Sequence, residues 1–372
     1  MKSNRNKIIF LGDDYGRPTG WSIVAENLFY NLDQEKSYEA YFAKGKVNND
    51  SKIKIKGILL SYKERLKFIF ILIDLFLVLS NIRFSKVKTI HCLAEPYLPL
   101  ALILSSIYRA DLISTIYGTH SVSPYYKKYK KIYELAYKKS KKISCISEYT
   151  KRRFIETWGN DHHNLEVVYI GCDQKKFCHK KNTKKEDFFL YVGTIKERKG
   201  LLPSLIAFEK LLNDFPNFTF QIAAERGFGT QKNSEYESRV FNLAAKYPKN
   251  IIFLGKISDN ELVEKYRKCS ANVLVSVSNE KVFEGFGMVH VEANLCGSLT
   301  IGGIDSPNEE LISNGINGYL ANGRDIESIF LAYKKTLSMI QNKKHHEIVQ
   351  DCIIAGKRFN WESFTKWHLE NY

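Results

Sequence analysis

Phe283-Glu284-Gly285-Phe286-Gly287-Met288-Val289-His290-Val291-Glu292-Ala293-Asn294-Leu295-Cys296-Gly297 is the stretch that decides the fold. It follows an apolar, β-branched run, 271–278, which is typical of a buried parallel strand. After Gly287 apolar residues recur at helical spacing, and Gly297 predicts the helix end. A strand, a glycine-rich turn and a helix place free backbone N–H groups and the positive end of a helix at the carboxyl edge of a sheet. Such a place suits a phosphate.

Two glutamates frame this turn. Glu284 lies in the turn itself, and Glu292 lies on the helix, where side chains lean back toward the N-terminus. We therefore expect both carboxylates to reach one ligand. A carboxylate accepts hydrogen bonds from vicinal hydroxyls, such as those of ribose or a hexose. The alternative is a solvent-facing helix whose acids only favour its N-terminal end.

Length and composition indicate a two-domain globular protein with an anionic partner. The 372 residues are enough for two cores, and 44% hydrophobic and 26% charged residues exclude a disordered chain. The net charge of +16 favours a phosphorylated substrate, an anionic membrane or nucleic acid. The seven cysteines are scattered and never spaced as C-x-x-C, which predicts reduced thiols in a cytosolic protein and no structural zinc site.

No signal-peptide core precedes the first apolar run. The most apolar segment, 68–79, has about half the length that a bilayer span needs and contains Asp74. This segment predicts a buried or membrane-facing helix and not a transmembrane one.

Two loops in the first half of the chain are candidates for ligand contact. A strand at 7–12 leads into a loop that contains Gly16 and Gly20, followed by a helix predicted over 22–32. A second strand, starting at Leu112, ends in a turn that carries His120, a natural hydrogen-bond donor or proton carrier near neutral pH. A plain turn and a structural histidine are the alternatives.

Residues 124–142 are the most basic part of the chain. A helix here would carry four tyrosines on one face, with lysines around the rest: Tyr126, Tyr129, Tyr133 and Tyr137. This pattern suits an interfacial helix on an anionic membrane, with the contact running through 126–142. It also suits nucleic acid, although no nucleic-acid motif accompanies it, and a solvated charged face is the third interpretation.

A cationic turn follows the strand at 188–193. Arg198 and Lys199 precede a helix that begins near Leu201, and cations at a helix N-terminus can clamp a diphosphate. Solvated surface cations are the alternative. Further on, Ser258 and Glu261 have the spacing of a capping box at a helix start.

The spacing from Glu284 to Glu292 resembles the E-x7-E signature of retaining glycosyltransferases of family 4, which have the GT-B fold. The resemblance implies that Glu284 lies against the donor sugar and Glu292 holds the donor ribose. It also implies that the backbone of the turn receives phosphate or sugar oxygens, through Gly285, Phe286, Gly287 and Met288.

Other positions match the family in part. Lys199-Gly200 resembles the end of its G-R-x-x-x-x-K-G motif, but Thr194 stands after Gly193 where the arginine is usual, so Arg198 is a candidate substitute. Gly255 and Ile257 resemble the residues that flank the nucleotide base. Gly20 resembles a loop glycine near the diphosphate, although Trp21 replaces its usual glycine neighbour. The T-x-H-G histidine is replaced by Tyr117, with His120 three residues later.

The resemblance implies an α/β fold of two Rossmann-like domains with parallel sheets facing a central cleft. Residues 1–171 would bind the acceptor and be joined by a C-terminal helix at about 357–372, and residues 172–356 would bind the nucleotide sugar. No Asp-x-Asp has a plausible metal-binding setting, so we expect neither metal nor cofactor. The nucleotide-diphosphate sugar is a substrate.

The implied activity is retaining transfer of a hexose from a UDP- or GDP-sugar to a hydroxyl. The expected acceptor is a lipid-linked or cell-surface glycan, lipopolysaccharide or polysaccharide, and the expected location is cytoplasmic, at the inner face of the membrane. A GT-B epimerase or phosphorylase and a non-catalytic nucleotide-sugar-binding protein are the alternatives. We expect no nucleic-acid partner.

Overall fold

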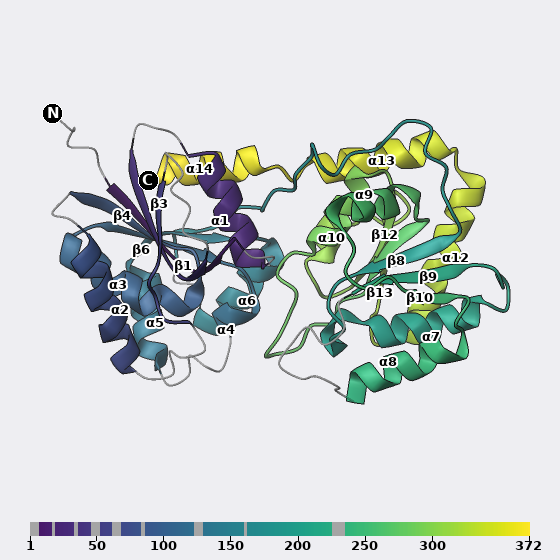
Figure 1. Cartoon of the computed structure of the whole chain (residues 1–372), viewed down its shortest axis with the longest axis horizontal. Helices are drawn as coiled ribbons and strands as arrows, with labels where there is room; N and C mark the ends of the chain where they lie inside the picture. Colours follow the sequence, from purple (N-terminus) through teal and green to yellow (C-terminus); the bar gives the residue numbers. More distant parts are fainter. Residues whose placement is uncertain are drawn as a thin grey trace. The chain divides into compact units, whose positions relative to one another are not determined.

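The chain divides into two compact α/β units (Figure 1). Unit 1 comprises Met1–Gly171 and Trp361–Tyr372, and unit 2 comprises Cys172–Asn360. The computed structural model describes residues 7–16, 19–32, 36–45, 53–61, 68–82, 86–122, 129–159, 162–224 and 235–372.

Unit 1 is built on a parallel sheet of seven strands in the order β3-β2-β1-β4-β5-β6-β7. The strand order reverses between β1 and β4, so loops that follow these two strands diverge at the carboxyl edge. The strands are β1 (Lys7–Tyr15), β2 (Ser37–Gly45), β3 (Ile53–Gly57), β4 (Val87–Cys92), β5 (Asp111–Ile116), β6 (Ser140–Cys145) and β7 (Leu165–Val167).

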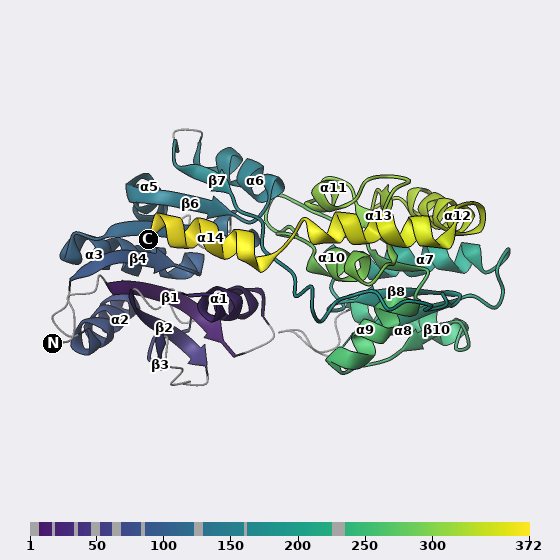
Figure 2. The same ribbon diagram turned by 90° about the horizontal axis from the view of Figure 1, so that it is seen from above.

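Helices cover both faces of this sheet. One face carries α1 (Gly20–Tyr30) and α14 (Trp361–Asn371), and the other carries α2 (Phe68–Asn81), α3 (Leu98–Tyr108) and α5 (Lys130–Lys139) (Figures 1 and 2). Two further helices, α4 (Thr119–Val122) and α6 (Glu148–Trp158), and a 3-10 turn, η2 (Glu95–Tyr97), complete the unit.

The C-terminal helix α14 is held to unit 1 by packing and by a buried polar chain. Its buried residues recur at helical spacing, at Trp361, Phe364, Thr365 and His368. The ring of His368 stacks on His91 at 5.1 Å, and the Tyr372 hydroxyl lies 2.7 Å from Nδ1 of His91.

Unit 2 is built on a parallel sheet of six strands in the order β10-β9-β8-β11-β12-β13. Its order reverses between the neighbours β8 and β11. The strands are β8 (Phe188–Val192), β9 (Thr219–Ala223), β10 (Ile251–Phe253), β11 (Ala271–Leu274), β12 (Leu299–Gly303) and β13 (Gly318–Ala321).

One face of this sheet carries α7 (Leu201–Leu211), α8 (Glu235–Lys246) and α12 (Ile326–Asn342). The other carries α9 (Asp259–Lys268), α10 (Met288–Leu295) and α13 (His345–Lys357) (Figure 1). The short elements are η4 (Glu197–Lys199) and α11 (Asn308–Leu311). The predicted pair of parallel α/β domains is therefore confirmed.

Local signals were reliable guides to helix ends. Ser258 and Glu261 form the predicted capping box at the start of α9, and Gly297, at φ +79°, directly follows the C-cap of α10. Several bounds differ from the prediction. α1 covers Gly20–Tyr30, where 22–32 was predicted, and α14 covers Trp361–Asn371, where about 357–372 was predicted. β1 continues to Tyr15, and the ladder of β11 ends at Leu274, because only four of its residues pair with β12.

The basic stretch does not form the long amphipathic helix predicted over 124–142. α5 covers only Lys130–Lys139, and residues 140–142 belong to strand β6, because they pair with β5. Tyr133 and Tyr137 are buried in the core of unit 1, so this part of the tyrosine face points inward. Residues 124–128 lie outside the described part of the chain. Among the described residues, no helix has both the length and the hydropathy of a membrane span.

Candidate active site

The candidate site lies where the strand order of unit 2 reverses. β8 and β11 are neighbours, and the segments that follow them, 193–200 and 275–287, leave the same carboxyl edge of the sheet. In open parallel sheets this is the usual place for a ligand. Eight of the predicted site residues belong to these two segments, namely Gly193, Thr194, Arg198, Lys199, Glu284, Gly285, Phe286 and Gly287.

One short contact holds the first segment to β8, and another joins the two segments. The Tyr191 hydroxyl donates to the Thr194 carbonyl at 2.8 Å, and the Val277 N–H donates to the Arg198 carbonyl at 2.8 Å. Gly200 has φ +67°, and a Cβ there would lie 2.3 Å from the carbonyl oxygen of Val275. Only glycine therefore allows this close approach.

Arg198, Lys199 and Glu284 converge in this place. The Arg198 guanidinium donates to Oε2 of Glu284 at 2.9 Å, and the Lys199 ammonium donates to the same oxygen. The Ser276 hydroxyl also donates to it, at 3.4 Å. The side chains of the three charged residues are only 29%, 13% and 15% exposed, so the charges interact with little screening by water.

The electrostatics of the cluster keep Glu284 ionised. Burial raises the pKa of its carboxyl, but the charges of Lys199 and Arg198 and their hydrogen bonds outweigh burial and lower the pKa to about 2. Burial lowers the pKa of Lys199, and the nearby Arg198 adds to this effect while Glu284 opposes it. With two cations against one carboxylate, the cluster favours a further anion.

The glycine-rich turn leads directly into α10. Gly287 is the N-cap, with φ +95°, and α10 begins at Met288. The ring of Phe286 is buried and packs against Phe359 at 5.4 Å, which fixes the turn within unit 2. Gly285 and Met288 are half-buried. The first N–H groups of α10 therefore follow the Glu284 turn without interruption, as an anion site would require.

Glu292 has partners of its own. Its Oε2 accepts the hydroxyl of Tyr266, from α9, at 2.8 Å. Burial raises the pKa of Glu292 to about 7, although the Tyr266 hydrogen bond and the Lys176 charge act in the opposite direction. Shared contact of Glu284 and Glu292 with one ligand stays a prediction.

The remaining donor-side candidates lie at strand ends of unit 2. Gly193, directly after β8, has φ +154°, and Thr194 is half-buried beside it. Gly255 follows the edge strand β10 with φ +69°, and no atom of the described residues lies within 4 Å of a Cβ built there. Ile257 is half-buried two residues later. A side chain at position 255 would therefore meet none of the described residues at its Cβ.

Gly20 and His120 belong to unit 1. Gly20 is exposed at the start of α1, and among the described residues no atom lies within 4 Å of a Cβ built there. The His120 ring lies 4.7 Å from that of Trp21. Burial lowers the pKa of His120 to about 4, with Asp13 opposing, so its imidazole is neutral at neutral pH. The segments after β1 and β5 thus meet at the carboxyl edge of this sheet.

Sequence reasoning missed Glu95, which joins these segments of unit 1. Glu95 is 2% exposed and follows β4, and its Oε1 accepts the Tyr117 N–H at 2.9 Å. Its carboxylate also hydrogen-bonds the side chain of Trp21. Burial raises its pKa to about 7. An acid directly after a buried strand was the available signal. Ser276 and Tyr266 were missed too, because neither lies in a recognisable motif.

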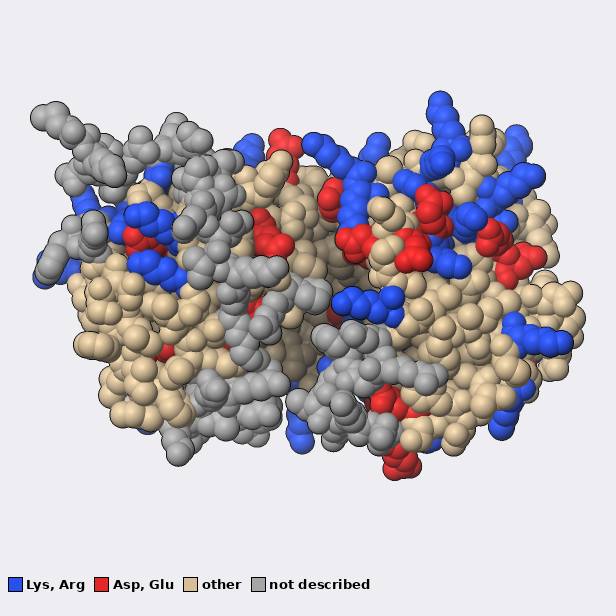
Figure 3. Space-filling model, viewed as in Figure 1, with Lys and Arg blue, Asp and Glu red and all other residues tan. Residues whose placement is uncertain are grey.

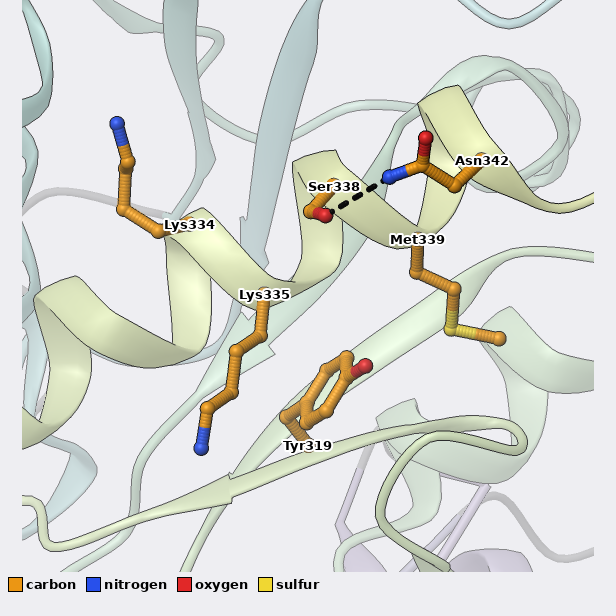
Figure 4. A pocket seen from close by; sticks show the side chains of 6 residues that line it. All are labelled: Tyr319, Lys334, Lys335, Ser338, Met339 and Asn342. Carbon is orange, nitrogen blue, oxygen red and sulfur yellow. Dashed lines mark hydrogen bonds between the residues drawn. The ribbon is translucent and has the colours of Figure 1, made fainter.

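The hollow described in unit 2 lies apart from the cluster of Arg198, Lys199 and Glu284. A hollow of about 440 Å³ lies over α12 and the start of β13, away from the carboxyl ends of the strands (Figure 4). Two lysines are among its lining residues, Tyr319, Lys334, Lys335, Ser338, Met339 and Asn342. Among the described residues, no three His, Cys, Asp or Glu side chains come together in a way that would hold a metal ion.

A match to a known protein family covers most of unit 2. The profile of the family described as "Glycosyl transferases group 1" matches residues 173–352. A curated relative, an "Uncharacterized glycosyltransferase MJ1178" of Methanocaldococcus jannaschii, is 27% identical over 232 residues. This match covers 60% of the chain and 56% of the relative, so the chain spans little more than half of that protein.

Solved structures match over nearly the whole chain. Anabaena Alr3699/HepE, in complex with UDP and glucose, has a TM-score of 0.75 at 17% identity and covers 98% of this chain and 99% of its own. The lipopolysaccharide outer core galactosyltransferase WaaB, in its apo form, has a TM-score of 0.71 at 18% identity, with 98% and 100% covered. The GT-B fold that the sequence predicted is thereby confirmed.

Proposed function

Residues 173–352 belong to the glycosyl transferases group 1 family, and on this basis we propose that the chain is a retaining glycosyltransferase. It moves a hexose from a UDP- or GDP-sugar to a hydroxyl acceptor without a metal ion. Unit 2 binds the nucleotide sugar and unit 1 binds the acceptor. The observation that carries the proposal is the convergence of Arg198 and Lys199 on Glu284 at the carboxyl edge of unit 2.

In this proposal Arg198 and Lys199 bind the diphosphate of the donor. Its two anionic phosphates compete with Glu284 for Arg198 and Lys199, whose charges exceed that of the carboxylate by one. All three hydrogen bonds described for Glu284 end on Oε2, which supports a role for Oε1 in binding a sugar hydroxyl. As the phosphate leaves, the same two cations stabilise its growing charge. The contact of Arg198 with Glu284 supports its substitution for the arginine missing at Thr194.

Other parts of unit 2 hold the rest of the donor. In this proposal the backbone from Gly285 to Met288 binds phosphate or sugar oxygens, and Glu292 binds the ribose. Gly255 and Ile257 flank the base, and Gly193 and Thr194 line the diphosphate. The half-buried position of Glu292 and the open space at Gly255 support these roles.

The chemistry then consists mainly of positioning and electrostatics. The departing phosphate takes the proton of the acceptor hydroxyl on the same face of the sugar, which retains the anomeric configuration. Unit 1 contributes Gly20 and His120 to the reaction. A neutral His120 imidazole can donate or accept one hydrogen bond without adding charge.

For the acceptor we propose a lipid-linked or cell-surface glycan. The likeness to a lipopolysaccharide galactosyltransferase supports this class. The enzyme would work in the cytoplasm and meet its acceptor at the inner face of the membrane, through lysines of the stretch 126–142. Within α5, Lys130, Lys131, Lys138 and Lys139 are exposed, which supports such a contact.

Thermal unfolding with a panel of UDP, GDP, UDP-glucose and GDP-mannose tests the donor site. A ligand that binds only the folded state raises the melting temperature with its concentration. We expect one nucleotide pair to do so in the wild type and in Lys335→Ala, whose lysine lines the separate hollow, and to do so much less in Lys199→Ala. An unchanged shift in Lys199→Ala, or its loss in Lys335→Ala, would refute the assignment.

The same panel, followed by product analysis, separates the alternatives. A transferase forms product only with a second hydroxyl compound, whereas an epimerase needs none and a phosphorylase needs phosphate. A non-catalytic protein would bind nucleotide and release no nucleoside diphosphate from any donor.

A further inference from the structure

Helix α2 exposes an apolar stripe between Ile69 and Phe76. Ile69, Leu72, Ile73 and Phe76 are 53%, 45%, 40% and 71% exposed, and their spacing places them on one side of the helix. Figure 3 shows that the surface of unit 1 over α2 and α3 is almost free of Lys, Arg, Asp and Glu. We define these four side chains as the α2 stripe.

The opposite side of α2 is firmly attached to unit 1. Ile71 and Val78 are buried in the core, and the buried Asp74 accepts the Leu60 N–H at 2.8 Å. The helix therefore cannot turn its stripe inward without breaking this hydrogen bond and exposing Ile71 and Val78. With 14 residues it is also too short to cross a bilayer. The stripe is thus a fixed surface feature, available to a partner.

We propose that the α2 stripe inserts into the interface of an anionic membrane. This inference rests on the membrane contact included in the proposed function and adds its apolar part, on a different helix from the stretch 126–142. α2, α3 and α5 form one layer on the same face of the sheet (Figures 1 and 2). The same layer also exposes Ile107 of α3 and Leu135 of α5, which are 51% and 49% exposed.

The positive charge of α5 favours an anionic partner for this layer. Around Leu135, α5 exposes Lys130, Lys131, Lys138 and Lys139, whereas the described part of α2 carries no charge except the buried Asp74. Apolar side chains flanked by lysines match the acyl boundary and the anionic headgroups of a bilayer.

A second copy of this chain fits the stripe less well. The four side chains expose on the order of 400 Å², which is a marked patch for a monomer but about half of what each partner buries in a standard interface. Two such faces would also bring the lysines of both copies close together. The observations therefore favour a lipid surface.

Sedimentation with vesicles tests the proposal on the full chain. The vesicles contain either equal parts of dioleoylphosphatidylglycerol and dioleoylphosphatidylcholine or the latter lipid alone. We expect the wild type to bind the anionic vesicles at least tenfold more tightly than the neutral ones. Leu72→Ser combined with Phe76→Ser should weaken anionic binding at least tenfold, because the stripe then loses two of its large apolar groups.

The matched control removes two exposed apolar side chains from unit 2. Leu331→Ser combined with Ile354→Ser changes residues that are 48% and 57% exposed and should bind vesicles within twofold of the wild type. A second readout uses Phe76→Trp, whose added indole fluorescence should be quenched by brominated lipid in anionic vesicles. This variant keeps the stripe apolar, so it remains informative if the double serine variant fails to fold.

Several outcomes would overturn the proposal. They are wild-type protein that does not bind anionic vesicles, a stripe variant that binds within twofold of the wild type, and a Phe76→Trp variant whose added fluorescence is unchanged by brominated lipid. A wild-type dimer that the stripe variant converts to monomer would assign the face to a second copy instead. Nucleotide-induced thermal shifts should be equal in all these variants, so failure here is distinguishable from failure of the donor site.

Discussion

Replacement of Glu284 by glutamine isolates the charge at the centre of the candidate site. Glutamine keeps the shape of the side chain and one hydrogen-bonding oxygen, but it leaves Arg198 and Lys199 without an anionic partner. Because the Lys199 and Glu284 side chains are only 13% and 15% exposed, water can compensate little of this loss. We expect Glu284→Gln to fold, to be less stable, and to have lost most of its transfer activity.

The lowered pKa of Glu284 gives the expected loss in the free energy of unfolding. A carboxyl whose pKa falls from 4.5 in the unfolded chain to about 2 in the folded chain contributes about 3 kcal/mol to stability at neutral pH. The effect of breaking a buried ion pair, about 3–5 kcal/mol, agrees with this value. Since the folded pKa is the lower one, the contribution is complete above pH 4.5. It is lost as the pH falls from about 4.5 toward 2.

Urea unfolding with two optical probes measures this difference. All four tryptophans, Trp21, Trp158, Trp361 and Trp367, belong to unit 1, so their fluorescence follows that unit, whereas far-UV circular dichroism follows both. We expect Glu284→Gln to shift the circular-dichroism transition to lower urea and to leave the fluorescence transition in place. The matched control is Glu327→Gln, whose carboxylate pairs with Lys210 on the surface of unit 2, where the side chains are 54% and 45% exposed. It should change stability by less than about 0.5 kcal/mol.

Two results would refute this reasoning. One is a Glu284→Gln protein whose unit 2 is as stable as the wild type at pH 7. The other is a stability difference that stays constant between pH 5 and pH 3, because the charge of Glu284 would then not be its cause.

Three further predictions concern residues that stabilise the loops at the carboxyl ends of the two sheets and the attachment of α14. Gly200→Ala should destabilise unit 2 by at least about 3 kcal/mol in urea unfolding, because φ is +67° and the added Cβ would meet the Val275 carbonyl. The control Gly255→Ala, at φ +69° but without such a contact, should cost only about 1 kcal/mol. Equal effects of the two substitutions would contradict the steric argument. As the pH rises from 4.5 to 7, the wild type should lose stability because burial raises the folded pKa of Glu95 to about 7. Glu95→Gln lacks this carboxyl, so it should gain up to about 3 kcal/mol relative to the wild type, measured by the fluorescence transition. A pH-independent difference would show that Glu95 does not titrate in this range. Tyr372→Phe should lower the stability of unit 1, measured by tryptophan fluorescence, by about 1–3 kcal/mol, because Nδ1 of His91 loses its hydrogen-bond partner at 2.7 Å. An unchanged transition would show that this contact does not stabilise α14.

Features that depend on neighbouring residues could be predicted from the sequence. The capping box at Ser258 and the left-handed Gly297 each involve residues within one or two helical turns, so local preferences are enough to specify them. The pair of parallel sheets, in contrast, was predicted from the resemblance to family 4 and not from local patterns. Charge patterning was less informative, since the lysines and tyrosines of 124–142 look amphipathic whether the chain forms a helix or, from Ser140 onward, a strand.

The resemblance singled out Glu284 and Lys199, but the sequence could not say which side chains would meet. Arg198 and Glu284 are 86 residues apart, and they touch because β8 and β11 are neighbours in the sheet. Glu95 holds the Tyr117 turn for the same reason, from adjacent strands of unit 1.

The sequence by itself determined the strand–turn–helix units, their glycines and the acids and cations at their ends. Only the tertiary structure decided which of these ends share an edge, that Tyr133 and Tyr137 point into the core, and that α2 keeps an apolar face outside. The physical reason is that turns and caps are specified by contacts close in sequence. Strand order and the burial of one helix face arise from the packing of all layers together.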